Sequence, residues 1–185
     1  MKRIVILILT LWGITSEVAA QDTFYTKGGK ISFFSKAPLE NIEANHSGVT
    51  CVMDKKTGLL QFSLLMKGFE FEKALMQEHF NENYVESDKY PKSTFRGQIT
   101  NNGDVNYSSD GTYPAKVKGS LVIHGETREI ETSGTIEVKN GKLMLKAEFP
   151  VLLSDYKISI PSINNDNVSN TIRITVNCSL ELLKS

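Results

Sequence analysis

The stretch Val168–Leu182 reads VSNTIRITVNCSLEL and alternates between apolar and polar residues. From position 172 to 182 every even residue is apolar, and from 169 to 181 every odd residue is polar. Side chains of a β-strand point alternately to its two faces, so this pattern predicts a strand with one buried face and one wet face. At about 3.3 Å per residue it would span roughly 50 Å, far beyond an ordinary strand of roughly 5–6 residues.

The same alternation recurs along most of the chain. It is clear in residues 113–123, 130–138 and 141–153, and we expect further strands at 24–35, 41–53, 58–69 and 93–100. Turn-forming residues separate these segments at Asp54–Gly58, Asn101–Asp104, His124–Thr127 and Lys139–Lys142, where Asn140-Gly141 is the strongest short hairpin signal. Consecutive hairpins without a long crossover predict an up-and-down antiparallel sheet, and closing about eight strands into a barrel removes its exposed edges.

Three segments interrupt this pattern. Glu70–Phe80 has Phe71, Leu75, Met76 and His79 at helical spacing, which predicts a short helix or turn. Asn81–Lys92 and Tyr156–Asn167 are mostly polar connections, and each contains a proline. Long irregular segments of a small barrel are commonly functional, so we expect these at its ends, as a lid or rim.

The first twenty residues have the composition of a secretory signal peptide. Lys2 and Arg3 precede the apolar run Ile4–Trp12, and Val18-Ala19-Ala20 provides small residues before a cut at Gln21. An apolar run of about ten residues is too short for a bilayer, which needs roughly twenty, and no cysteine for lipid attachment lies near the cut. We predict a cleaved leader at 1–20 and one domain at 21–185, located in the periplasm or secreted.

The composition excludes several classes of protein. The 185 residues carry 21 Lys+Arg and 21 Asp+Glu, without the positive surplus that nucleic-acid binding needs. A hydrophobic fraction of 40% is too high for a disordered chain and too low for a polytopic membrane protein. The sequence contains no HExxH, Cys/His cluster, GxSxG or glycine-rich phosphate loop, so we expect neither a metal site nor catalytic residues.

A barrel of about eight long strands leaves two interpretations of its interior open. It is just wide enough either to be filled by side chains or to hold one slender ligand. A filled interior is the commoner state of a small barrel, whereas an elongated apolar tunnel would suit an acyl or prenyl chain. Composition alone does not distinguish between them.

Several ordered motifs resemble those of the YceI-like family. They are Met76–Phe80 with Asp88–Pro91 and Ser93–Gly97, then Val117–Arg128, and finally Phe149–Pro161. The resemblance covers about residues 23–183 and implies an exported barrel that binds a polyisoprenoid or other long amphiphilic chain in its lumen. The predicted fold is therefore all-β: an extended eight-stranded antiparallel lipocalin-like barrel with a short helical segment near residues 70–80.

One segment departs from the family pattern. Many members carry an Arg-Asp pair after the third strand, where this chain reads LMQEHFN at Leu75–Asn81. Any role of that pair therefore cannot be transferred to this chain, and the difference indicates a subgroup with its own rim.

The resemblance favours a hollow barrel that holds an isoprenoid or quinone-type lipid and needs no other cofactor. Candidate ligand-binding residues are inner-phase or rim side chains: soft apolar groups, His79 at the mouth, and tyrosines whose hydroxyls could meet a polar head group. They are Phe33, Phe62, Met66, Phe69, Leu75, Met76, His79, Phe80, Tyr84, Tyr90, Phe95, Leu121, Ile123, Phe149, Val151, Tyr156, Ile158, Ile172, Ile174 and Val176. Two alternatives remain: a packed barrel that binds another envelope protein, and an enzyme acting on a small apolar substrate. The sequence identifies no protein partner and leaves both a monomer and a dimer open.

The two cysteines and the remaining histidines give weaker signals. Cys51 and Cys178 share the phase of apolar neighbours and should point inward, either as a disulfide or as two free thiols. His46 falls on the polar phase of its strand and His124 in a turn, so we expect both at the surface.

Overall fold

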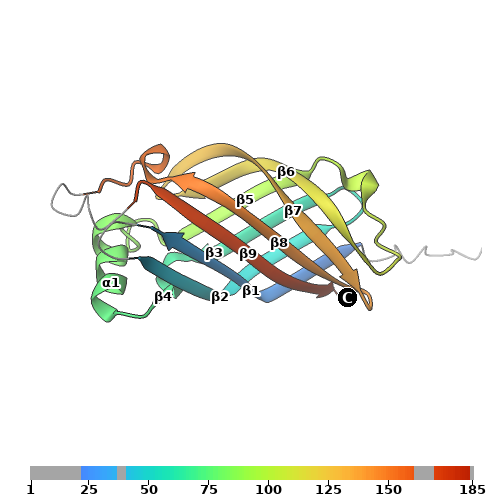
Figure 1. Ribbon diagram of the computed structural model, residues 1–185, viewed down its shortest axis with the longest axis horizontal. Coiled ribbons are helices and arrows are strands. Elements are labelled where there is room, and N and C mark those ends of the chain that lie inside the picture. Colours follow the sequence, from blue (N-terminus) through green and yellow to red (C-terminus); the bar gives the residue numbers. More distant parts are fainter. Residues whose placement is uncertain (1–21, 37–40, 161–168, 184–185) are drawn as a thin grey trace, which may run out of the picture.

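Eight long strands form a closed antiparallel barrel in the computed structural model, which describes residues 22–36, 41–160 and 169–183 (Figure 1). The strands are β1 (Thr23–Ser35), β2 (Ile42–Asp54), β3 (Leu59–Leu65), β5 (Lys92–Ile99), β6 (Gly111–Ile123), β7 (Glu126–Lys139), β8 (Lys142–Leu152) and β9 (Thr171–Leu182). Their order around the barrel is β1-β9-β8-β7-β6-β5-β3-β2, and the pairing of β1 with β2 closes it. The eight-stranded antiparallel barrel expected from the alternation is therefore confirmed.

Short elements gather at one end of the barrel, on the left in Figure 1. A 3-10 turn at Met66–Gly68 leads into the two-residue strand β4 (Glu70–Phe71), which pairs with β2. The helix α1 (Ala74–His79) follows and continues into a π-helical turn at Phe80–Tyr84, while a 3-10 turn at Leu153–Tyr156 ends β8. The expected short helix is confirmed, although Phe71 belongs to β4 rather than to the helix. Another 3-10 turn, at Asn102–Asp104, lies between β5 and β6.

Several strand ends differ from the prediction, and β7, for example, begins at Glu126 instead of residue 130. β3 stops at Leu65 instead of residue 69, because the chain turns at Met66–Gly68. β9 begins at Thr171, and Val168 and the predicted leader 1–20 lie outside the described residues. Leu182 was expected on the buried face, yet it is 41% exposed because it pairs with Phe24 at the very end of the barrel. None of the helices in the described part of the chain is long and apolar enough to cross a bilayer.

Two of the predicted turns have the backbone that a tight hairpin requires. Asn140 and Gly141 have φ values of 50° and 73°, and His124 and Gly125 have values of 52° and 75°. Two successive positive φ angles define the type I′ turn, whose twist matches that of the flanking strands. These turns fix the registers of β6 with β7 and of β7 with β8.

Two bulges shift the side-chain phase within the first hairpin. The register of β1 with β2 slips between Thr26 and Gly29 and again between Gly29 and Ile31, where Val49 and His46 are the partners. Because each slip of one residue exchanges the two faces of a strand, the inward phase of β2 changes from even to odd positions. His46 consequently points inward and is only 6% exposed, so its predicted surface position is wrong.

The end of the barrel opposite α1 is packed solid. Fully buried side chains there include Cys51, Met53, Leu143, Cys178 and Leu180. Gly29 faces them from β1, and a Cβ atom at this position would lie 2.6 Å from the Cys178 Sγ. The absence of a side chain at Gly29 thus lets three strands close tightly over this end.

Candidate functional site

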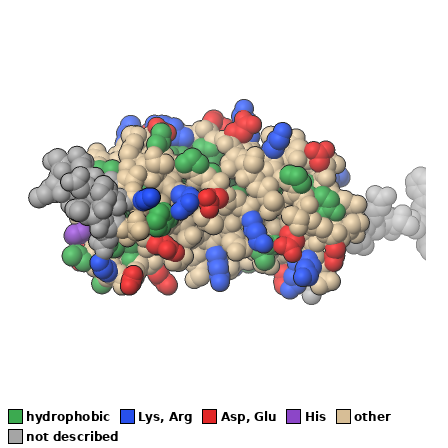
Figure 2. Space-filling view, in the orientation of Figure 1, with side chains coloured by type: hydrophobic (Ala, Val, Ile, Leu, Met, Phe, Trp, Pro, Cys, Tyr) green, Lys and Arg blue, Asp and Glu red, His purple; other side chains and the backbone are tan. Residues whose placement is uncertain are grey.

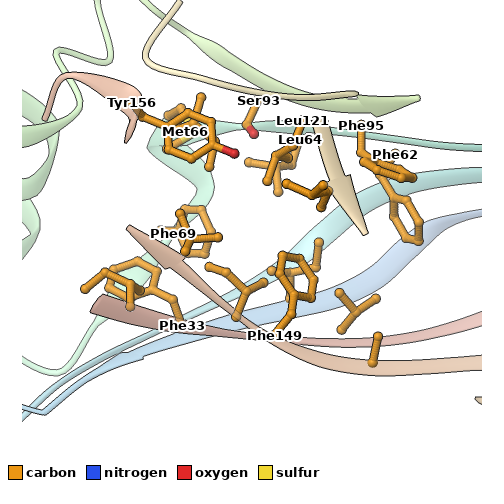
Figure 3. A pocket seen from close by; sticks show the side chains of 18 of the residues that line it. Phe33, Phe62, Leu64, Met66, Phe69, Ser93, Phe95, Leu121, Phe149 and Tyr156 are labelled. Atoms are coloured by element: carbon orange, nitrogen blue, oxygen red, sulfur yellow. The ribbon is translucent and has the colours of Figure 1, made fainter. Parts of the chain in front are cut away.

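The α1 end of the barrel is hollow. A cavity of about 560 Å³ runs inward from this end and is lined by side chains from all eight long strands (Figure 3). It reaches as far as Ile99, Ala115, Ile136 and Leu145, beyond which the packed end begins. The interior is therefore neither wholly filled nor wholly hollow: it is an apolar pocket with a packed floor, within the size range of small-molecule sites.

Four phenylalanines pack together where the α1 segment meets the barrel wall. The Phe33 ring, on β1, lies 5.2 Å from Phe69, 5.7 Å from Phe71 and 5.4 Å from Phe80. Phe80 in turn lies 5.6 Å from Phe69 and 5.1 Å from Phe71. Aromatic pairs at such distances stabilise beyond the area that they bury, so this cluster attaches the helical segment to the mouth of the cavity.

Nineteen of the twenty candidate residues named from the sequence line this cavity. They include the long inner-face set of β9 and the rim residues Leu75, Met76 and His79 of α1. Leu75 is 61% exposed while also lining the cavity, which places it at the mouth. Whether these side chains contact a ligand stays a prediction.

Tyr90 is the candidate that the structure places elsewhere. Its ring packs edge-on against His124, with 4.5 Å between the ring centroids, and it is not part of the cavity wall. Several lining residues were not named from the sequence, among them Leu64, Val117, Ile130, Ala147 and Leu153. Strand phase could have identified Val117 and Ala147, whereas Leu153 lines the cavity from the turn after β8.

His124 joins three segments of the chain beside the cavity mouth. One ring nitrogen, Nδ1, lies 3.0 Å from the backbone oxygen of Tyr156, and the other, Nε2, lies 2.8 Å from the Glu86 carboxylate. Both partners are hydrogen-bond acceptors, so the two ring nitrogens link the turn between β6 and β7 to Tyr156 and to Glu86. The His124 side chain is only 11% exposed, and its predicted surface position is wrong because this contact buries it.

His46 also has a structural role. Its Nε2 lies 3.0 Å from the Leu65 backbone oxygen, and its Nδ1 accepts the Gly48 N–H at 3.0 Å. A Cβ at Gly68 would lie 2.3 Å from the same ring, so glycine there allows the close approach. His46 therefore stabilises the turn after β3. His79 stays exposed on α1.

Comparison with known proteins assigns the chain that forms this cavity to a family. The model of the YceI-like domain matches residues 14–180. The chain belongs to the YceI-like family. The comparison with curated proteins finds no match.

Solved structures share the YceI-like fold at low sequence identity. A polyisoprenoid binding domain from Saccharophagus degradans implicated in plant cell wall breakdown has a TM-score of 0.76 at 12% identity, over 89% of this chain and 100% of that one. BcnA from Burkholderia cenocepacia has a TM-score of 0.67 at 15% identity, over 82% and 95%. The YCEI protein of Campylobacter jejuni has a TM-score of 0.62 at 19% identity, over 80% and 88%.

Outside the cavity, this YceI-like chain carries scattered charge. Figure 2 shows acidic and basic side chains intermixed over the visible face. Among the described residues no group of three or more His, Cys, Asp or Glu side chains is arranged to hold a metal ion. Ion pairs such as Lys142–Glu181 and Lys157–Glu126 lie at the surface, where they contribute little to stability.

Both cysteines of the YceI-like barrel are free thiols at its packed end. Of the two states left open by the sequence, the structure has the unpaired one. Burial raises the pKa of Cys178 to about 11 and raises that of Cys51 further, and the nearby Cys178 adds to the effect on Cys51. Since the thiolate is the reactive form, neither side chain is suited to redox or nucleophilic chemistry at neutral pH.

The thiols give a testable pH dependence. A thiol whose pKa is raised in the folded state stabilises that state fully below its ordinary pKa and loses this effect as the pH rises through the folded value. Between pH values of about 9 and 11 the unfolded chain releases the Cys178 proton while the folded chain keeps it. The free energy of unfolding, measured with urea, should therefore fall by about 2 kcal/mol from this residue over that range.

The matched control is the variant Cys178→Ala, whose unfolding free energy should depend less on pH in the same interval. Ellman's reagent at pH 8 provides a second measurement: the native protein should not react, and the unfolded protein should react at both cysteines. Rapid reaction of the native protein would contradict the burial of these thiols.

Proposed function

We propose that this protein is exported and holds one long apolar molecule, an isoprenoid or a quinone-type amphiphile, in the barrel cavity. The observation that carries the proposal is the cavity itself, a pocket of about 560 Å³ that is lined mostly by apolar side chains and closed at its inner end. Each CH₂ group moved from water into such a pocket contributes about 0.8 kcal/mol to the binding free energy, so burial of a long apolar chain is enough to give a high affinity. The signal-peptide composition of residues 1–20 supports export.

Two further observations support binding rather than catalysis. The solved domain from Saccharophagus degradans is described as polyisoprenoid binding and shares the fold. Among the described residues the cavity wall carries no carboxylate, and its titratable side chains there are Lys73, His79, Tyr84, Lys146 and Tyr156. General acid–base catalysis needs polar partners that converge on a reacting atom, and this wall does not bring such a set together.

The proposal is tested by identifying what the protein carries. The full chain is expressed with its leader, purified without detergent from the exported fraction and extracted with organic solvent for mass spectrometry. We expect a prenyl or acyl species in an amount close to one molecule per protein, and rebinding of that species to the delipidated protein. An unrelated exported protein from the same cells serves as control. If the extract holds no such species and none rebinds, the proposal is wrong.

A further inference from the structure

The Tyr156 hydroxyl faces the cavity and has no hydrogen-bond partner in the described part of the chain. The Tyr156 side chain is 2% exposed and lines the cavity, and Figure 3 shows its oxygen directed inward from the rim. Within the described residues this hydroxyl makes no hydrogen bond, whereas Tyr107 and Tyr113 donate theirs to Asn102 Oδ1 and to the Ser109 backbone oxygen. Because Tyr156 lines the cavity, its hydroxyl is available to donate to a polar ligand atom inside the apolar pocket.

Tyr156 is held firmly in place. Its backbone oxygen lies 3.0 Å from His124 Nδ1, and Glu86 fixes the other side of the His124 ring at 2.8 Å. Lys157, the next residue, has a φ of 54°, as its position after the 3-10 turn requires. Burial, assisted by Asp155 and opposed by Arg128, raises the pKa of Tyr156, so the phenol remains a protonated donor at neutral pH.

Ser93 provides a hydrogen-bond acceptor at the same end of the cavity. Its hydroxyl donates to the Val122 backbone oxygen at 2.8 Å and lines the cavity, so its oxygen can still accept. Val122 and His124, which anchor Ser93 and Tyr156 respectively, are two residues apart at the end of β6. The Ser93 hydroxyl and the Tyr156 backbone are therefore both attached to one short stretch of the rim.

We propose that Tyr156 and Ser93 form a hydrogen-bonding subsite for the uncharged oxygen, a hydroxyl or carbonyl, at the polar end of the bound chain. The ligand then lies with its tail toward the packed floor and its oxygen under the rim. The inference rests on the proposed function and adds to it a head-group class and an orientation.

The charges around the subsite favour an uncharged oxygen over an anion. In the described part of the chain, the lysine and arginine side chains of the cavity wall are Lys73, at the start of α1, and Lys146, which pairs with Glu137 at 3.5 Å. Lys73 follows β4, which pairs with β2, whereas Tyr156 is anchored on β6. Arg128, on β7 next to β6, pairs with Glu126 at 3.5 Å and is not part of the wall. A carboxylate or phosphate at Tyr156 would thus be buried without a wall cation beside it, which is costly.

The test compares four probes that differ only at one end: geranylgeraniol, its methyl ether, the hydrocarbon without oxygen, and geranylgeranoate. Each is titrated into the delipidated protein and into the variants Tyr156→Phe and Ser93→Ala. We expect Tyr156→Phe to lower the affinity for the alcohol and the ether about five- to tenfold, and to leave that for the hydrocarbon unchanged. Ser93→Ala should weaken only the alcohol, because the ether has no proton to donate. Tyr113→Phe, at the packed end, is the matched control and should bind every probe normally.

Two outcomes would overturn the subsite. One is unchanged binding of the alcohol by Tyr156→Phe, with the variant folded as judged by circular dichroism. The other is tighter binding of geranylgeranoate than of geranylgeraniol by the unaltered protein. Failure of the unaltered protein to bind any probe, the hydrocarbon included, would instead overturn the proposed function on which the subsite rests.

Discussion

Replacing Ala147 with tryptophan is expected to lower the affinity for geranylgeraniol about a hundredfold while leaving the barrel folded. Ala147 lines the cavity on β8, opposite Gly134 of β7 and Val176 of β9. Gly134 has no side chain, so the wall is recessed here and an indole can occupy the lumen. Displacing about four methylene groups of the ligand costs about 3 kcal/mol, which corresponds to the stated loss.

Glu148→Trp is the matched control for this experiment. Glu148 is the next residue of the same strand, points to solvent and pairs with Arg173 at 3.7 Å. The only tryptophan of the sequence is Trp12, inside the predicted leader, so the fluorescence of each introduced indole reports its own surroundings. Ala147→Trp should show blue-shifted emission and weak binding, and Glu148→Trp red-shifted emission and normal binding. Equal affinities of the two variants for geranylgeraniol would show that this ligand does not bind inside the cavity.

Local patterns were sufficient to predict most of the barrel. The alternation in β9 and the Asn140-Gly141 turn depend on neighbouring residues, and the structure has both where the sequence placed them. Inward phase along the strands also located much of the cavity wall, because a closed barrel has only two faces per strand. The residues alone did not predict that part of the lumen is hollow, because the same pattern of inward apolar side chains fits a filled or an empty barrel.

The errors in the prediction come from contacts between distant segments. His46 was assigned to the surface by extending the phase of Cys51 and Met53, and the bulge beside Gly48 reverses that phase. The sequence treated Tyr84, Tyr90 and Tyr156 alike as hydroxyls for a head group. Two of them have different positions because of His124, which binds the Tyr156 backbone oxygen and packs edge-on against the Tyr90 ring. No local pattern around residue 156 records a partner 32 residues away.

The structure of the rim also depends on contacts between distant segments, which local sequence patterns do not predict. The motif around Leu75–Asn81 departs from that of many family members, and in the structure it forms α1 and the beginning of the π-helical turn. Phe80 packs on Phe33 and Phe71 and so joins this segment to the barrel. The helix therefore depends on aromatic contacts across the mouth, since six residues are too few to be stable alone.

Replacing Gly119 with alanine is expected to destabilise the barrel strongly. Gly119 of β6 pairs with Gly97 of β5, and Gly97 lies against the Phe95 ring. A Cβ at Gly119 would lie 2.3 Å from the Gly97 Cα and 2.4 Å from the Arg96 backbone oxygen. Backbone atoms cannot rotate away as a side chain can, so β5 and β6 would have to separate. We expect the free energy of unfolding to fall by about 3 kcal/mol or more, measured by urea unfolding, and the melting temperature to fall by about 10 °C.

Gly28→Ala is the matched control, because a Cβ there meets no atom within 4 Å, and it should change the unfolding free energy by less than about 0.5 kcal/mol. Equal stabilities of the two variants would show that the close approach of β5 and β6 at this glycine pair does not exist in solution.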